Sequence, residues 1–140
     1  MDANILLYAE DSLSPFHERA RIYWDGLLSG SRPVGLAWES ILAFIRISTN
    51  PRVFKKPLFM EEAVERVQSW IGQPCVLIVQ PTGNHWERLR ACLKAGRAAS
   101  ALVSDAHLAA LAMEHGADLS SSDSDFARFP GLKWRDPLKN

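Results

Sequence analysis

The sequence predicts an α/β protein, a three-layer α/β/α sandwich with a mostly parallel central sheet. Short, almost wholly apolar runs are typical of strands that are buried on both faces of a parallel sheet. These runs alternate with longer segments of helical spacing along the whole chain. The 140 residues are 47% hydrophobic and 23% charged, without repeats or a linker-like stretch, so residues 1–140 are expected to form a single domain.

In the first half of the chain, one strand is expected to precede three helices. Residues 4–9 (NILLYA) form the apolar run expected of a buried strand. The first helix is expected between Ser14, whose hydroxyl can cap it, and Gly30, which ends it. Residues 38–47 (WESILAFIRI) are apolar nearly all round, so the second helix should be central and buried. The third helix covers residues 61–71, which carry apolar side chains on one face.

In the second half, strand and helix signals alternate. Residues 75–79 (CVLIV) predict a further buried strand. The remaining expected elements are a helix over 84–94, a short strand over 101–103, a helix over 106–115 closed by Gly116, a weak strand over 118–121 and an edge strand over 132–135.

Composition and charge exclude several classes of protein. Sixteen basic residues balance sixteen acidic ones, so any contact with RNA requires a local basic patch. Cys75 and Cys92 lack CxxC spacing, which argues against a thiolate metal site or a disulfide framework. The first residues carry no basic segment, and their apolar run is too short for a signal peptide or membrane span. We therefore expect a cytoplasmic protein.

Acidic side chains lie next to the expected strands, at the edge where open α/β sheets bind ligands. Asp105 follows one strand, Asp123 and Asp125 follow another, and Asp2 adjoins the first. Each has a simpler explanation when it is considered alone. Asp105 could cap a helix, Asp123 and Asp125 could form a turn, and Asp2 could be an exposed terminal residue.

For Glu39, a purely structural role is harder to assign. It shares one stripe of an otherwise apolar helix with Ala43 and Arg46. A buried carboxylate needs an ion pair or a metal, because burial without a partner is costly. An ion pair with Arg46 and a role in a functional site are equally compatible with the sequence.

Taken together, Asp2, Glu39, Asp105 and Asp123 could bring several carboxylates to one end of the sheet. Such carboxylates repel one another unless a cation neutralises them. Ligand sets made only of oxygen suit Mg²⁺ or Mn²⁺ better than Zn²⁺. A carboxylate-held Mg²⁺ suits the hydrolysis of phosphodiesters.

Four segments carry a resemblance to a known family and, with their spacing, extend it along essentially the whole chain. The chain resembles PIN-domain toxins of the VapC type, the ribonuclease half of a bacterial toxin–antitoxin pair. The combination is specific, although each acidic motif alone is weak. The segments are DANILLY (2–8), WESILAFIRISTNP (38–51), SDAHLAALAMEHG (104–116) and SDSDFARFPG (122–131).

The resemblance implies a PIN-like fold and an acidic Mg²⁺ or Mn²⁺ site that cuts single-stranded or looped RNA. Asp2 and Asp105 would be the principal metal ligands. Asp123 would be a third ligand, directly or through water, and Glu39 would complete the acidic cluster.

The resemblance also implies supporting residues and partners. Asn4 and Ser122 would orient the carboxylates. Asp125 would replace Asp123 if the register differs, and would otherwise cap the turn before Phe126. The expected partners are a cognate VapB-type antitoxin, whose C-terminal segment lies over the active site, and a second copy in a homodimer.

A basic loop in the middle of the chain is the candidate RNA contact. Phe54 and Phe59 are interleaved with its cations, so one ring could stack on an unpaired base while cations hold phosphates. The pattern slightly favours a solvated loop anchored by two aromatic rings. The cations are Arg46, Arg52, Lys55 and Lys56.

Two other classes of function remain as alternatives. The first is a catalytically inactive PIN-like domain that binds RNA or a protein. The second is a phosphatase with an aspartyl nucleophile, which requires a general acid two residues after the first aspartate. Asn4 occupies that position and has no proton to give, which argues against a phosphatase.

Overall fold

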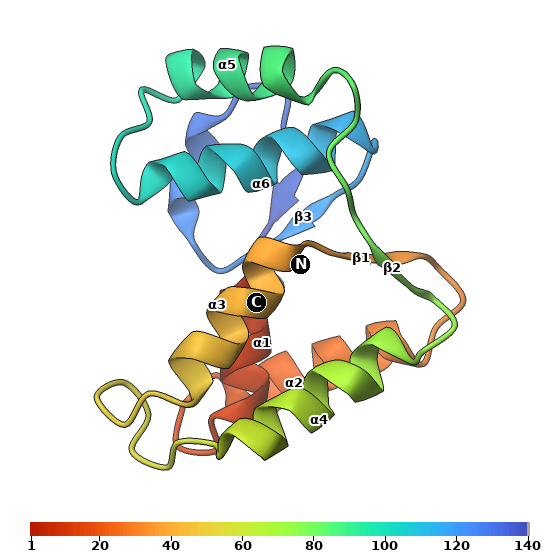
Figure 1. Cartoon of the computed structure of the whole chain (residues 1–140), viewed down its shortest axis with the longest axis vertical. Helices are drawn as coiled ribbons and strands as arrows, with labels where there is room; N and C mark the ends of the chain where they lie inside the picture. The colour runs from red at the N-terminus through yellow and green to blue at the C-terminus, as the bar shows by residue number, and fades with distance from the viewer. Residues whose placement is uncertain (140) are drawn as a thin grey trace.

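The computed structural model describes residues 1–139. Helices α1–α4 pack together at one end of the molecule, and α5 and α6 cover the other end (Figure 1). In chain order the elements are α1 (Ala3–Glu10), α2 (His17–Leu28), β1 (Val34–Leu36), α3 (Trp38–Ser48), α4 (Met60–Ile71), β2 (Val76–Ile78), α5 (His85–Ala95), α6 (Leu102–Glu114), β3 (Leu119–Ser120), the 3₁₀ helix η1 (Ser124–Arg128) and β4 (Trp134–Arg135).

The strand expected over residues 4–9 is wrong, because this segment is helix α1. Asp2 caps the helix, and its carboxylate accepts a hydrogen bond from the Ala3 N–H at 2.7 Å. Ile5, Leu6 and Ala9 are buried at helical spacing. A short apolar run has no period that separates a buried strand from a buried helix, so the prediction depended on length alone.

The short strand expected over residues 101–103 is also wrong. Helix α6 begins at Leu102 and therefore includes most of this run and the expected helix over 106–115. It is preceded by Ser100, whose φ is 53°. As a result, Asp105 lies in the first turn of α6 and not at the end of a strand.

The other expected helices are confirmed, but two predictions of burial are not. Helix α3 was expected to be buried all round, yet Trp38 is 46% exposed and Leu42 is 62% exposed. Strand β2 confirms the run at 75–79, yet Leu77 is 56% exposed. Both elements lie at the surface with only one face packed on the core.

The strands pair in parallel, as the sequence predicts, and the α/β class is confirmed. Strand β1, which was not expected, pairs with β2, and β3 pairs with the short edge strand β4. Within residues 1–139 these pairs form two separate two-stranded sheets. The backbone of Met1 donates to Gly35 O at 3.2 Å, and that of Asp2 donates to Ser120 O at 3.0 Å. The first two residues therefore lie between the two sheets.

Each end of the molecule has its own apolar core. In the first, Trp70 packs against Trp24 and Phe44, with ring centroids 5.6 and 4.7 Å apart. In the second, helix α6 packs on Phe126 and Phe129. The N-terminus of α6 and residues 1–4 meet where the two cores adjoin, so rigid elements position the acidic residues.

Among residues 1–139, no helix is long and apolar enough to cross a membrane.

Candidate metal centre

Three carboxylates come together beside the N-terminus of α6. Asp105 lies in the first turn of α6, Asp123 caps η1, and Asp125 lies in the first turn of η1. One oxygen from each of the three lies within 4.8 Å of the others. Asp123 also accepts a hydrogen bond from the Asp125 N–H at 2.9 Å, which holds the turn in shape. The chain folds back from β3 to α6 at this point, so segments about twenty residues apart in sequence converge.

Asp2 lies beside this group but is not one of the three closest carboxylates. Its Oδ1 accepts from the Ala3 N–H, and its Oδ2 accepts from the Ser121 hydroxyl at 2.6 Å. Its charge still acts on the cluster, because it raises the pKa of Asp105. The expected ligand set was Asp2, Asp105 and Asp123, whereas the closest set contains Asp125 as well as Asp105 and Asp123.

Ser121 links the residues of the site and was missed in the sequence. It is fully buried; its hydroxyl donates to Asp2 and accepts from Asn4 Nδ2 at 3.1 Å and from the Asp123 N–H at 3.0 Å. Asn4 Oδ1 in turn accepts from the Ser122 N–H at 3.4 Å. Asn4 therefore contacts the carboxylates only through the Ser121 hydroxyl, and Ser122 contributes its backbone. In the sequence, Ser121 is one of a run of three serines with nothing to single it out.

The cluster repels additional negative charge. Burial, together with the neighbouring charges of Asp123, Asp2 and Asp125, raises the pKa of Asp105 to about 6 against the opposing effect of Arg128. Burial also raises the pKa of Asp2, although its hydrogen bonds from Ser121 and Ala3 oppose the shift. Carboxylates with raised pKa values in one place are typical of functional sites that a cation can neutralise.

Glu39 contacts the first of two adjacent histidines. Its side chain is 47% exposed, and its Oε1 lies 2.8 Å from His107 Nε2, an ion-pair contact without the alignment of a hydrogen bond. His107 Nδ1 lies 2.8 Å from His85 Nε2, and His85 Nδ1 contacts Glu114. Among residues 1–139, no ion pair joins Glu39 to Arg46.

This chain of four side chains was not predicted. In the sequence, His107 stands two positions from Asp105, and His85 is one of four scattered histidines. Thr82 completes the chain, because its N–H and hydroxyl donate to Glu114 Oε1 at 3.1 and 2.6 Å. Side chains from α3, α5 and α6 thus meet beside the acidic cluster, and only the packing of these helices brings them together.

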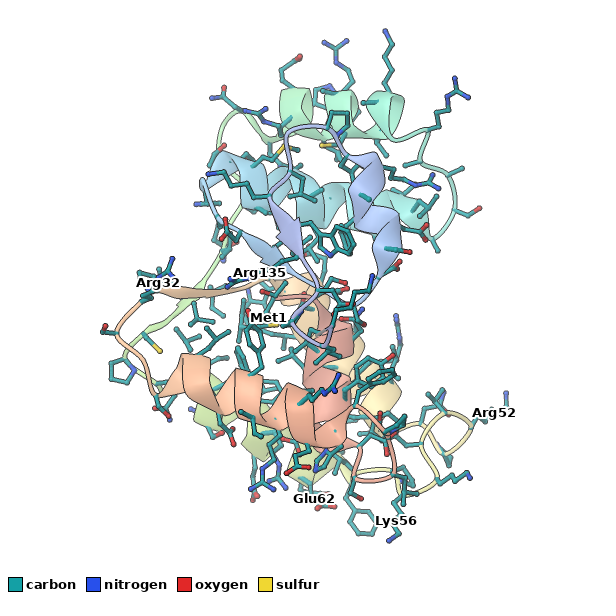
Figure 2. The ribbon with its side chains drawn as sticks, turned by 180° about the vertical axis from the view of Figure 1, so that it is seen from behind. Met1, Arg32, Arg52, Lys56, Glu62 and Arg135 are labelled. Carbon is teal, nitrogen blue, oxygen red and sulfur yellow. The ribbon has the colours of Figure 1, made fainter. Side chains whose placement is uncertain are left out.

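The basic loop lies away from the carboxylates. Arg46 lies in the last turn of α3, and the other three cations follow the helix before α4, at the end opposite Glu39. Figure 2 shows Arg52 and Lys56 at the edge of the molecule, far from Met1. Phe54 is only 5% exposed and anchors the loop, whereas Phe59 is 75% exposed. The prediction that aromatic rings anchor the loop thus holds for Phe54, whereas the ring of Phe59 is exposed.

A small apolar pocket lies between the site and this loop. Its volume is about 240 Å³, and its wall includes Asn4 from the site together with Val53 and Phe54 from the loop. Tyr8 and Ile47 supply the helical sides. The pocket therefore lies between Asn4 and the basic loop.

Known proteins resemble this chain along nearly its full length. The family described as "PIN domain" matches residues 1–132. Ribonuclease VapC37 of Mycobacterium tuberculosis (strain ATCC 25618 / H37Rv) is 44% identical over 98% of this chain and 95% of its own length. Ribonuclease VapC33 of Mycobacterium tuberculosis (strain CDC 1551 / Oshkosh) is 38% identical over 99% and 96%. VapC ribonuclease Mb2897 of Mycobacterium bovis (strain ATCC BAA-935 / AF2122/97) is 35% identical over 99% and 94%.

Proposed function

The chain belongs to the PIN-domain family, among its VapC-type ribonucleases, and from this premise we propose that it is a metal-dependent endoribonuclease, the toxin of a type II toxin–antitoxin pair. The observation that carries the proposal is the group formed by Asp105, Asp123 and Asp125, which offer three carboxylate oxygens within 4.8 Å of one another. The names of the relatives support RNA cleavage as the reaction. The geometry of the three carboxylates supports this group as the catalytic site.

The residues at the site fit a hard divalent cation. The donors are carboxylate oxygens, without thiolate or imidazole in the closest set, which favours Mg²⁺ or Mn²⁺. Asp105 and Asp123 would hold the ion, with Asp125 or Asp2 completing the set. When bound, the ion neutralises charge on a phosphodiester and lowers the pKa of water for attack.

The protein's own residues orient the site. Ser121 holds Asp2 and Asp123 at fixed positions, and Asn4 is held in turn by Ser121 and the Ser122 N–H. Fixed carboxylates require little rearrangement when the phosphodiester reacts, which is the advantage of a preorganised site. Glu39, which contacts His107, is the proposed carboxylate that accepts a proton from water.

The proposed path of the RNA runs from the acidic site along the apolar pocket to the basic loop. The pocket contacts both Asn4 and Phe54, and exposed Phe59 offers a ring for stacking on an unpaired base. Arg52, Lys55 and Lys56 are exposed cations on the same loop. Positive charge placed away from the carboxylates can hold phosphates without occupying the metal site.

The test is end-mapped cleavage of a total-RNA pool by the wild-type protein and by Asp105→Asn. The reactions contain Mg²⁺, Mn²⁺ or a chelator, and Asp25→Asn on the exposed face of α2 is the matched control. We expect cuts at defined sites with the wild type and the control, and their loss with chelator and with Asp105→Asn. The relative activity with the two ions identifies the preferred metal.

The opposite outcome would assign a different class of function. If the wild type and Asp105→Asn gave the same background, the chain would be an inactive PIN-like domain that binds RNA or a protein.

We further propose a VapB-type antitoxin as partner and a homodimer as the free state, supported by the exposed Trp38 and Leu42 on one face of α3. Size exclusion with light scattering tests the dimer, and loss of cleavage on adding the antitoxin tests the partner.

A further inference from the structure

The apolar pocket beside Asn4 has room for one flat ring system. Its volume is about 240 Å³. Pockets for drug-sized ligands measure roughly 300–1,000 Å³, so this pocket suits a smaller group. Its lining includes Phe54, which is 5% exposed, and Val53, which is 58% exposed. The pocket therefore extends from the core to the surface.

The walls of the pocket suit the face of an aromatic ring. Tyr8 supplies a ring of its own, which packs on Phe16 with ring centroids 5.2 Å apart. Leu7 and Ile47 supply aliphatic side chains. Unpaired bases of RNA stack on aromatic side chains, and all four bases have a face that can do so. The walls alone therefore accept a base without selecting one.

Two polar side chains interrupt the apolar lining, Asn4 and Asp11. Both ends of the Asn4 amide are engaged, because Nδ2 donates to Ser121 and Oδ1 accepts from the Ser122 N–H. Asp11 Oδ1 accepts from the Leu13 N–H at 3.1 Å. Within residues 1–139, no hydrogen bond engages the second oxygen of Asp11. This carboxylate is thus fixed in place and has acceptor capacity left for a ligand.

The position of Asp11 is unfavourable for a carboxylate. It is the C-cap of α1, where the helix dipole places partial negative charge. The neighbouring Glu10 pairs with Arg66 at 3.0 Å, whereas no ion pair in the described part of the chain neutralises Asp11. This end of the pocket is therefore electronegative and favours a ligand edge made of N–H donors.

We infer that the apolar pocket binds an unpaired guanine of the RNA substrate and that Asp11 determines this specificity. The inference rests on the proposed ribonuclease function. On its Watson–Crick edge, guanine presents two adjacent donors, N1–H and the N2 amino group, to the two oxygens of one carboxylate. Adenine and cytosine present an amino group beside an acceptor nitrogen, and uracil presents one N–H between two carbonyls. These acceptors repel a carboxylate.

The surroundings of the pocket place this guanine in a nucleotide beside the cleaved bond. Asn4 borders the pocket, and the Ser121 hydroxyl joins Asn4 to Asp2 and Asp123. On the other side of the pocket the basic loop offers the exposed cation Arg52 for a neighbouring phosphate. The RNA backbone can thus pass from the acidic site to the loop while one base turns into the pocket.

The experiment titrates the protein, in chelator, with the four ribonucleoside 5′-monophosphates. Methyl NMR signals of Leu7, Ile47 and Val53 report occupation of the pocket, and the shared ribose phosphate makes differences in Kd a property of the base. We expect guanosine monophosphate to bind about fivefold or more tightly than uridine monophosphate, as is typical of a bidentate contact to a base. Ribose 5-phosphate, which has no base, should leave these methyl signals unchanged.

Asp11→Asn separates specificity from structure. The amide oxygen can still accept from the Leu13 N–H, so the turn is kept, but the side chain no longer offers two acceptor oxygens. We expect the preference for guanosine monophosphate to disappear. Asp136→Asn is the matched control, because Asp136 Oδ1 accepts from the Leu138 N–H at 2.9 Å in the same way, away from the pocket. This control should keep the preference.

Equal affinity for the four nucleotides would overturn the inference, as would a guanine preference that Asp11→Asn leaves intact. Equal shifts with ribose 5-phosphate would assign the contact to the phosphate and would also overturn it, and so would methyl signals that no nucleotide shifts. The titration uses neither cleavage nor a metal, so its failure is separate from failure of the proposed nuclease activity.

Discussion

At the scale of single residues, the carboxylate of Asp105 is where charge and burial conflict most. Burial and three neighbouring acids raise its pKa to about 6, from an ordinary value of 3.8. Between these values the folded protein binds more protons than the unfolded chain, so this group lowers stability as the pH rises. The destabilisation is complete above about pH 6 and is absent below about pH 3.8.

Asp105→Asn should therefore stabilise the protein while it abolishes cleavage. In chelator near pH 7.5 we expect Tm to rise by roughly 2–4 °C, because the repelled charge is removed. Near pH 4 the gain should largely vanish. Added Mg²⁺ or Mn²⁺ should raise Tm of the wild type but not of the variant, since only a site that binds the ion is stabilised by it. A lower Tm of the variant at both pH values would contradict this account.

Ser121 provides a second prediction at this scale. Ser121→Ala removes one hydroxyl that serves Asp2, Asn4 and Asp123. Leaving buried polar groups without partners costs about 1–3 kcal/mol. We expect cleavage to fall roughly 10- to 100-fold, as for other groups that orient metal ligands. The measurement is cleavage rate against metal concentration.

The control for this variant is Ser120→Ala. Ser120 is also buried and lies next to Ser121 in the chain, but its hydroxyl bonds to the Tyr23 hydroxyl at 2.7 Å and not to the site. Equal losses of activity in both variants would show that Ser121 acts only through general stability.

At the scale of elements, the contact between α3 and α6 places Glu39. His107 is held by His85, which Glu114 holds from the end of α6. We expect His107→Ala to release Glu39 and to lower kcat about tenfold with little change in KM, because general-base assistance contributes factors of this order or more. Single-turnover cleavage measures the chemical step.

His115→Ala is the matched control for this prediction, since His115 lies just past α6 and its side chain bonds to Gln80 O at 2.7 Å, away from Glu39. Glu39→Gln should reproduce the defect of His107→Ala, and the double variant should be no worse than either alone. Additive losses would mean that the two residues act independently.

At the scale of the whole molecule, the basic loop and the acidic site lie at opposite ends of α3. Replacing Arg52, Lys55 and Lys56 by Ala should raise KM severalfold, with kcat within about twofold. The slope of log KM against log salt should fall by about 2, since each phosphate contact to a single strand contributes about 0.7. Kinetics at three salt concentrations test this. The control removes three cations from α5 instead: R88A, R90A and K94A.

Much of the fold follows from local pattern. The four helices α2–α5 were predicted because periodicity over a dozen residues, with caps and glycine stops, is a strong signal. The two errors, at residues 4–9 and 101–103, fall on short apolar runs that carry no period. Strand β1 was missed because Val34–Leu36 is three residues long and contains a glycine.

The candidate site, like the fold, was predicted only in part from the sequence. By itself, the sequence identified the family and singled out Asp2, Asp105 and Asp123, because acidic residues in this order and spacing are a linear property of the chain. The tertiary structure decided which carboxylates meet, bringing Asp125 into the closest group. It also decided that Ser121 links them, that His107 contacts Glu39, and that the strands described in residues 1–139 form two separate sheets. Each of these depends on the approach of segments far apart in the chain, a distance that no local pattern encodes.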